Sequence, residues 1–176
     1  CEGPLSKSDT FTKAFAGDTM NMLVSASRLG AKTGYITHVG DDPFKDFLLN
    51  SWASEGIDLT CTTPLDRPSG LYFISILPDG DREFTYYRAG SAASYLSPED
   101  IDPAYIGKTR FLYASGISQA ISPSSRAAVL KAFQIAKIQA ENDIYGMTVL
   151  AEFYLKGLGT VRNSKLAFKL VKKAAL

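Results

Sequence analysis

Histidine and cysteine are scarce in this chain of 176 residues, which has one histidine, His38, and two cysteines, Cys1 and Cys61. Zinc sites and disulfide frameworks need several such residues at short, regular spacings, which this sequence does not provide. We therefore expect neither a metal site nor a disulfide-stabilised fold. So few cysteines are typical of a reducing compartment, and we expect a cytoplasmic location.

Long apolar runs and an excess of charge of one sign are also missing. No apolar run comes near the roughly 20 residues of a membrane-spanning helix, and the first residues lack the basic-then-apolar order of a secretion signal. Nineteen basic residues balance eighteen acidic ones, so no net field attracts nucleic acid or an anionic membrane. We expect neither as a partner. The chain opens on cysteine rather than methionine, from which we expect a preceding segment.

What is present is the pattern of an ordinary globular domain, with 45% hydrophobic and 21% charged residues. Helices are predicted over residues 18–29 and 44–55, with a strand over residues 33–39 between them. The residues expected to cap and terminate these helices are Asp18, Gly30, Asp42, Pro43 and Gly56. This alternation predicts an α/β unit with a largely parallel sheet.

The next segment changes to the two-residue period of a hairpin. Residues 71–77 and 83–88 are rich in aromatic and β-branched side chains, and they flank a Pro-Asp-Gly-Asp turn. A short strand is then predicted over residues 111–115, followed by a helix that starts near Ser122 and Pro123 and runs to residue 137.

The composition changes after residue 137. Acidic residues disappear after Glu152 while lysines accumulate, and two helices are predicted over residues 140–156 and 164–176. We place a boundary here, with one domain over residues 1–137 and a second over residues 138–176.

Several motifs then support a family resemblance. Residues 16–21 read Ala-Gly-Asp-Thr-Met-Asn, and residues 27–30 read Ser-Arg-Leu-Gly. They resemble the N-terminal signature of the ribokinase-like (PfkB) carbohydrate kinases, Gly-Gly-x-x-x-Asn followed by a helix that ends in Arg-Leu-Gly. Further matching stretches follow in the family's order at residues 39–44, 68–72, 84–93 and 111–126. The last three are similar to the 2-keto-3-deoxygluconate kinase branch.

The resemblance implies a fold, a reaction and a set of substrate-binding residues. The fold is a partial Rossmann-like (ribokinase-like) sheet with a β-hairpin lid, followed here by a short α-helical hairpin. The reaction is transfer of phosphate from ATP, with Mg²⁺, to a hydroxyl of a sugar acid. Gly17 would let its backbone approach the sugar, and Asn21 would hold sugar hydroxyls. Tyr72 and Tyr86 would line the pocket, and Arg88 would bind the substrate carboxylate.

Without the resemblance, the same residues have plainer interpretations. Tyr72, Tyr86 and Arg88 can be ordinary residues of an exposed hairpin, and Gly17 and Asn21 a turn glycine and a helix-start amide. His38 is expected in the core or a loop and Trp52 in the core. Asp41 and Asp42 are expected to serve a loop and a helix cap, and not as catalysts.

The Gly-Ala-Gly-Asp segment that gives this family its base and anion hole does not occur in the sequence. We therefore expect no catalytic, nucleotide-binding or metal residue here, and no phosphate transfer by this chain alone. Residues 140–175 instead resemble a Sel1-like helical repeat. The alternatives are a binding or scaffold module, with homodimerisation through the lid hairpin as its expected contact, and a truncated fusion product without function.

Overall fold

The structure is a computed structural model that describes residues 4–140 and Lys165. Its helices are α1 (Asp18–Arg28), α2 (Lys45–Ser54), α3 (Pro103–Ile106), α4 (Gly116–Ala120) and α5 (Pro123–Ala140). Its strands are β1 (Thr33–Gly34), β2 (Thr37–Gly40), β3 (Ile57–Asp58), β4 (Thr62–Leu65), β5 (Leu71–Ile76) and β6 (Arg82–Tyr87). Short 3₁₀ turns are η1 (Leu5–Lys7), η2 (Ala92–Tyr95) and η3 (Pro98–Asp100). Within these residues no helix is both long and apolar enough to cross a membrane.

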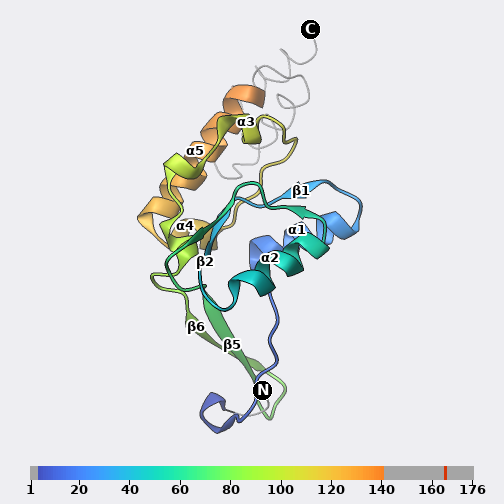
Figure 1. Ribbon diagram of the computed structural model, residues 1–176, viewed down its shortest axis with the longest axis vertical. Coiled ribbons are helices and arrows are strands. Elements are labelled where there is room, and N and C mark those ends of the chain that lie inside the picture. Colours follow the sequence, from blue (N-terminus) through green and yellow to red (C-terminus); the bar gives the residue numbers. More distant parts are fainter. Residues whose placement is uncertain (1–3, 141–164, 166–176) are drawn as a thin grey trace.

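A narrow parallel sheet separates two layers of helices (Figure 1). Strand β1 pairs with β3 and β2 with β4, both in parallel. On the side of α1 and α2, a buried cluster contains Met20, Val39, Trp52 and Ile57. On the side of α3 and α5, a second cluster contains Ile101, Ile106, Ala128 and Ala132. All four residues of β2 are buried, as expected for a strand that is covered on both faces.

The predicted strand over residues 33–39 is divided because the register of the sheet changes along it. Thr33 lies opposite Ile57, but Thr37 lies opposite Thr62, so the second chain contains one extra residue between the two ladders. Such a bulge interrupts the ladder. The Thr62 hydroxyl donates to the Tyr35 carbonyl oxygen at 3.0 Å and so satisfies an acceptor at the interruption.

Helices α1 and α2 end side by side, each before a glycine with a positive φ. These glycines are Gly30, with φ 88°, and Gly56, with φ 76°, as is usual beyond a helix C-terminus. Arg28 at the end of α1 donates two hydrogen bonds to the Glu55 carboxylate, at 2.7 and 2.5 Å. The paired helix ends therefore reinforce the packing of both helices on one face of the sheet.

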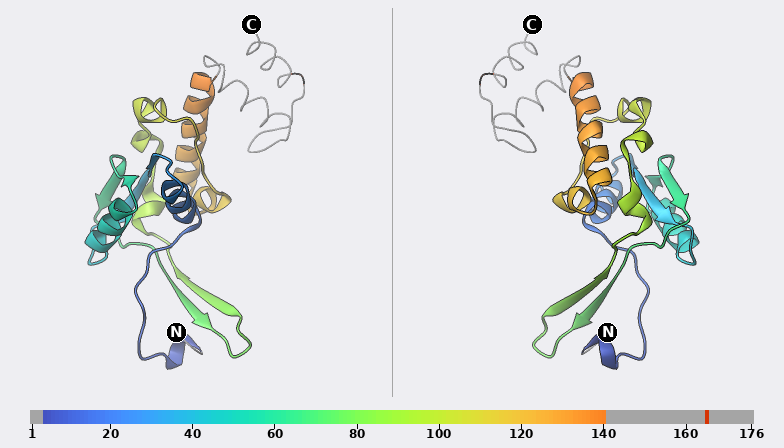
Figure 2. Two further views of the ribbon diagram at one scale, coloured as in Figure 1. Left: turned by 90° about the vertical axis from the view of Figure 1, so that its right-hand side faces the viewer. Right: turned by 90° about the vertical axis from the view of Figure 1, so that its left-hand side faces the viewer.

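Strands β5 and β6 form an antiparallel hairpin that projects away from the α/β body (Figure 2). The hairpin closes through Gly80, with φ 88°, whose N–H donates to the Leu77 carbonyl at 2.9 Å. The N-terminal segment runs down beside it, and the rings of Phe11 and Phe73 lie edge to face at 5.2 Å. One face of the hairpin is thus partly covered by the chain's own N-terminal segment.

Most predicted elements are confirmed, but several details differ. The N-cap of α1 is Gly17 and not Asp18, whose carboxylate accepts only from the neighbouring Thr19 N–H. Helix α2 starts at Lys45, one residue later than predicted. The predicted strand at residues 111–115 is wrong, because no described strand forms a ladder with it.

Sequence analysis also missed β3, β4 and the short helices α3 and α4. Helix α4 begins at Gly116. Ser115 caps it by accepting from the Ser118 N–H at 3.2 Å. Helix α5 begins at Pro123 as predicted, and the Ser122 hydroxyl accepts from the Ser125 N–H at 2.9 Å. It continues to Ala140, past the predicted end at residue 137. The helical hairpin predicted over residues 140–176 lies outside the described residues, apart from Ala140 and Lys165.

Candidate functional site

An open hollow of about 1720 Å³ lies against the α/β body and the base of the hairpin. It is bordered by the start of α1, the parallel strands, the hairpin, residues 111–114 and helix α5. All five residues that the sequence singled out for substrate binding line it: Gly17, Asn21, Tyr72, Tyr86 and Arg88. The fold thus brings together residues that lie up to 71 positions apart in the chain.

Gly17 ends the N-terminal segment and caps α1 with its backbone at φ 158° and ψ 149°. Side chains rarely allow this conformation, so glycine is required by the backbone itself. A Cβ built on Gly17 would meet only the Cβ of Met20, at 3.6 Å. The backbone at Gly17 is therefore open to close approach, as the sequence predicts for a sugar.

Asn21 lies one turn along α1, and its N–H donates to the Gly17 carbonyl at 2.7 Å. Its side chain is exposed on the hollow. Nearby, the Thr19 hydroxyl and the hydroxyl of the half-buried Tyr35 lie 3.4 Å apart. Burial raises the pKa of Tyr35, so this phenol stays neutral at physiological pH and can donate or accept a hydrogen bond.

The hairpin contributes a row of aromatic side chains from one of its faces. Tyr72 lies opposite Tyr86 in the ladder, with ring centroids 5.8 Å apart. Burial raises the pKa of Tyr72, and the neighbouring Tyr86 raises it further. The Tyr72 hydroxyl therefore remains a donor at neutral pH. The guanidinium carbon of Arg88 lies 4.5 Å from the centre of the Tyr86 ring. This stacking orients the cation beside the hollow.

Phe84 also lines the hollow, although sequence analysis did not single it out. Its ring stacks on Tyr86 at 6.1 Å with an interplanar angle of 11°, and it contacts Tyr72 at the same distance. The two-residue period of a strand could have identified Phe84, because residues 84 and 86 of one strand face the same side.

His38, Asp41 and Asp42 have structural roles in this region. His38 is buried in β2, and its Nε2 lies 3.0 Å from Asp100 Oδ2. Asp41 pairs with Lys45 at 2.5 Å, and Asp42 Oδ1 accepts from the Phe44 N–H at 2.9 Å. The predictions of a core histidine and a loop aspartate are confirmed. The prediction of Asp42 as the helix cap is wrong, because the N-cap of α2 is Phe44, whose N–H the Asp42 carboxylate accepts from just before the helix.

The carboxylates of the described residues do not gather into a cation site. Among these residues no group of three or more His, Cys, Asp or Glu side chains could hold a metal ion. Mg²⁺ binding to proteins relies on carboxylates together with substrate phosphates and water. The described part of the chain offers no cluster of three such side chains for the Mg²⁺ that the family resemblance implies.

Sequence comparison relates the chain to sugar-acid kinases. Residues 1–161 match the family described as pfkB family carbohydrate kinase, which extends past the predicted boundary at residue 138. The chain is 40% identical over 136 residues to a 5-dehydro-2-deoxygluconokinase of Clostridium perfringens, covering 76% of this chain and 40% of that protein. It is 34% identical over 138 residues to a 2-dehydro-3-deoxygluconokinase of Thermoproteus tenax, covering 77% and 42%. The chain thus spans about two fifths of the length of these curated relatives.

Solved structures support the same family and the ribokinase-like α/β fold. A PfkB protein from Polaromonas sp. JS666 superposes with a TM-score of 0.75 at 25% identity, covering 98% of this chain and 67% of that one. The fold is shared with the 2-dehydro-3-deoxygluconokinase of Thermotoga maritima, with a TM-score of 0.73 at 20% identity over 78% of this chain and 43% of that one. With the family match covering most of its length, the chain belongs to the pfkB family of carbohydrate kinases.

Proposed function

We propose that this chain supplies the sugar-acid-binding surface of a pfkB carbohydrate kinase that phosphorylates 2-dehydro-3-deoxygluconate or a related acid such as 5-dehydro-2-deoxygluconate. The observation that carries the proposal is the convergence of Gly17, Asn21, Tyr72, Tyr86 and Arg88 on one hollow. The names of the relatives support the substrate class. A cytoplasmic location belongs to the same proposal and rests on the scarcity of cysteine.

The chemistry of the hollow suits such a ligand. Arg88 offers a planar pair of N–H donors that matches a carboxylate, while Tyr72 and Tyr86 combine an apolar wall with a hydroxyl. The exposed backbone at Gly17 and the amide of Asn21 suit the hydroxyls of a polyol chain. The chain's share of the reaction would be to bind and orient the acceptor sugar.

The test is isothermal titration calorimetry of the full chain with each of the two sugar acids. We expect Arg88→Ala to weaken binding by about tenfold or more, because a hydrogen-bonded charge pair is lost. Arg82→Ala is the matched control, since Arg82 is an arginine of the same hairpin that does not line the hollow. Wild-type chain that binds neither acid, or Arg88→Ala that binds as well as Arg82→Ala, would contradict the proposal.

Phosphate transfer by the chain alone is not part of the proposal. The Gly-Ala-Gly-Asp segment that supplies the family's base and anion hole does not occur in the sequence. An assay of ADP release with either sugar acid, ATP and Mg²⁺ is expected to give no activity above background. Turnover that depends on Arg88 would show that this expectation is wrong.

A second proposal is that two copies of the chain pair through the hairpin. The hairpin face that carries Tyr72 and Tyr86 also carries the exposed apolar residues Ile76 and Phe84, which are 46% and 44% exposed. Exposed apolar patches of this kind mark contact surfaces. Covering this face would remove apolar area from water.

A further inference from the structure

The hairpin leaves the α/β body through two short segments, residues 68–70 and 89–92, which we call the hinge. The segments are joined to one another, since the Ala92 N–H donates to the Pro68 carbonyl at 2.9 Å. Gly90 has φ 68°, and the Ser91 N–H donates to the Arg88 carbonyl at 3.2 Å. Any rotation about the hinge would therefore move Tyr72, Tyr86 and Arg88 together relative to Gly17.

One side chain of the body holds this hinge. Asp42 Oδ2 accepts from the Ser69 N–H at 2.6 Å. Its other oxygen, Oδ1, accepts from the Phe44 N–H at 2.9 Å, and its carbonyl accepts from the Lys45 N–H at 3.0 Å. One carboxylate thus joins the start of α2 to Ser69 of the hinge.

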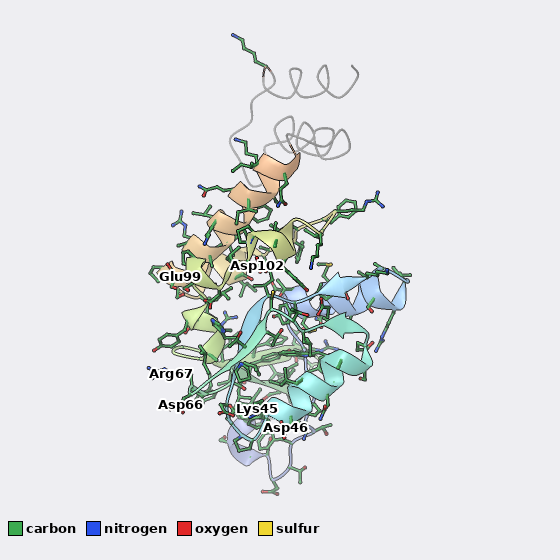
Figure 3. The ribbon with its side chains drawn as sticks, turned by 45° about the horizontal axis from the view of Figure 1, so that its top comes forward. Lys45, Asp46, Asp66, Arg67, Glu99 and Asp102 are labelled. Carbon is green, nitrogen blue, oxygen red and sulfur yellow. The ribbon has the colours of Figure 1, made fainter. Side chains whose placement is uncertain are left out.

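The hinge and the loop before α2 meet at the end of β2. A Cβ built on Gly40 would lie 2.3 Å from the Ser69 nitrogen, 2.6 Å from the Arg67 carbonyl oxygen and 2.7 Å from Asp42 Oδ2. The absence of a side chain at Gly40 is what allows the hinge to approach β2 so closely. Figure 3 shows Lys45, at the start of α2, and Arg67, just before the hinge, in the same lower part of the view.

The charge state of Asp42 suits this role. Partial burial raises the pKa of its carboxyl, but the hydrogen bonds from Ser69, Phe44 and Lys45 outweigh burial and hold the pKa below the usual value. An ionised carboxylate has two acceptor oxygens, so it can receive both backbone N–H groups at once. A group with a single acceptor oxygen cannot offer a separate oxygen to each of the two N–H groups.

We infer that Asp42 is a positioning residue, which fixes the orientation of the hairpin relative to the sheet and thereby sets Tyr72, Tyr86 and Arg88 over the hollow. Its effect on ligand binding rests on the proposed function, whereas its effect on the hairpin does not. Holding binding groups in place before the ligand arrives reduces the entropic cost of binding.

The experiment measures the hairpin directly. Cys1 and Cys61 are replaced by serine, and spin labels are attached to cysteines introduced at Asp79, in the hairpin turn, and Asn50, on α2. Pulsed electron–electron double resonance then gives the distribution of distances between the two spin labels. We expect Asp42→Asn to broaden it, because asparagine keeps one oxygen for the Phe44 N–H but has none left for the Ser69 N–H.

Asp41→Asn is the matched control, because Asp41 is the preceding residue and pairs with Lys45 instead of the hinge. Asp42→Ser is measured in parallel, since the serine hydroxyl can also accept from a backbone N–H but has a single oxygen. Broadening in both Asp42 variants, with the melting temperature of at least one kept near that of Asp41→Asn, supports the inference. A distribution as narrow as that of Asp41→Asn in either Asp42 variant overturns it.

A binding titration separates this inference from the proposed function. If the wild-type chain binds a sugar acid, we expect Asp42→Asn to weaken binding by about tenfold, in line with the loss of one charge-assisted hydrogen bond. Wild-type chain without affinity, together with a broadened distribution in Asp42→Asn, would reject the proposed ligand and keep the role of Asp42. If the wild-type chain binds a sugar acid, and Asp42→Asn keeps both that affinity and the wild-type distance distribution, the proposed ligand stands and the role of Asp42 is rejected.

Discussion

At the scale of single residues, Gly40 decides how closely the hinge approaches the sheet. The Cβ of an alanine there would lie within 2.6 Å of two backbone atoms of residues 67 and 69, and backbone cannot move aside as a flexible side chain can. We expect Gly40→Ala to lower the free energy of unfolding by about 1–3 kcal/mol, the usual cost of overpacking. Urea denaturation followed by circular dichroism measures this.

Gly116→Ala is the matched control for Gly40→Ala. Gly116 opens α4, its φ is not positive, and nothing lies within 4 Å of a Cβ built on it. Alanine there should change the free energy of unfolding by no more than about 0.5 kcal/mol. Equal effects of the two substitutions would show that the close approach at Gly40 carries no energetic weight.

Residue chemistry also limits what could be predicted about the site. Gly17, Asn21, Tyr72, Tyr86 and Arg88 could be named from motifs, because glycine, amide, tyrosine and arginine have recognisable binding chemistry. Asp42 could be predicted only as a helix cap. Its second oxygen binds a residue 27 positions away, and a local pattern does not contain such a contact.

At the scale of secondary structure, elements with strong local signals were predictable and those that depend on a partner were not. Helices α1 and α2 end at glycines with positive φ, and the hairpin has both its two-residue period and a Gly-containing turn. The segment at residues 111–115 has the composition of a strand, but a strand also needs hydrogen bonds from a neighbour. Phe111 instead accepts from the Thr109 hydroxyl at 2.8 Å and is exposed.

The hairpin itself carries a prediction about self-association. One face carries Tyr72, Ile76, Phe84 and Tyr86, whereas Phe73 of the other face is partly covered by Phe11. If two copies pair through the first face, Ile76→Lys should shift the chain towards monomer, because the lysine charge would lose its hydration on pairing. Sedimentation velocity over a range of concentrations measures the shift.

Glu83→Lys is the control for Ile76→Lys, since it places the same side chain on the opposite face of the hairpin. It should leave the sedimentation profile unchanged. A wild-type chain that stays monomeric at every concentration would contradict pairing through this face, and so would a shift of equal size in both variants.

At the scale of the whole molecule, carboxylates join elements that are distant in sequence. Glu55 joins α2 to Arg28 of α1, Asp58 accepts from the Tyr105 hydroxyl at 3.0 Å, and Asp100 lies 3.0 Å from His38 of β2. Asp58 and Asp100 thus join the side of α3 and α5 to the sheet, Glu55 joins α1 to the end of α2, and Asp42 joins the hinge to the start of α2. The parallel sheet is only two strands wide in the described residues, so such contacts matter more than they would in a broad sheet.

These carboxyl groups share a lowered pKa. The hydrogen bond from Arg28 lowers the pKa of Glu55, and those from Thr60 lower the pKa of Asp58. For Asp42 and Asp100, burial raises the pKa, but hydrogen bonds outweigh it. On the alkaline side, burial raises the pKa of Tyr35.

The sign of the resulting pH dependence follows from linkage. A carboxyl whose pKa is lower in the folded state stabilises the fold above its unfolded pKa of about 4, and the contribution is lost as the pH falls through the folded value. A tyrosine whose pKa is raised on folding costs stability once the pH exceeds about 10, where the unfolded phenol ionises. We therefore expect a plateau of stability between about pH 5 and 9, with a decline on both sides.

Thermal melts followed by circular dichroism from pH 3 to 11 measure this profile. Asp58→Asn should make the acid limb shallower, because it removes a carboxyl whose pKa changes on folding. Asp46→Asn, in the first turn of α2, is the control for the loss of one carboxylate charge. A melting temperature that stays constant down to pH 3, or equal slopes for Asp58→Asn and Asp46→Asn, would contradict the expected contribution of Asp58 to the acid limb.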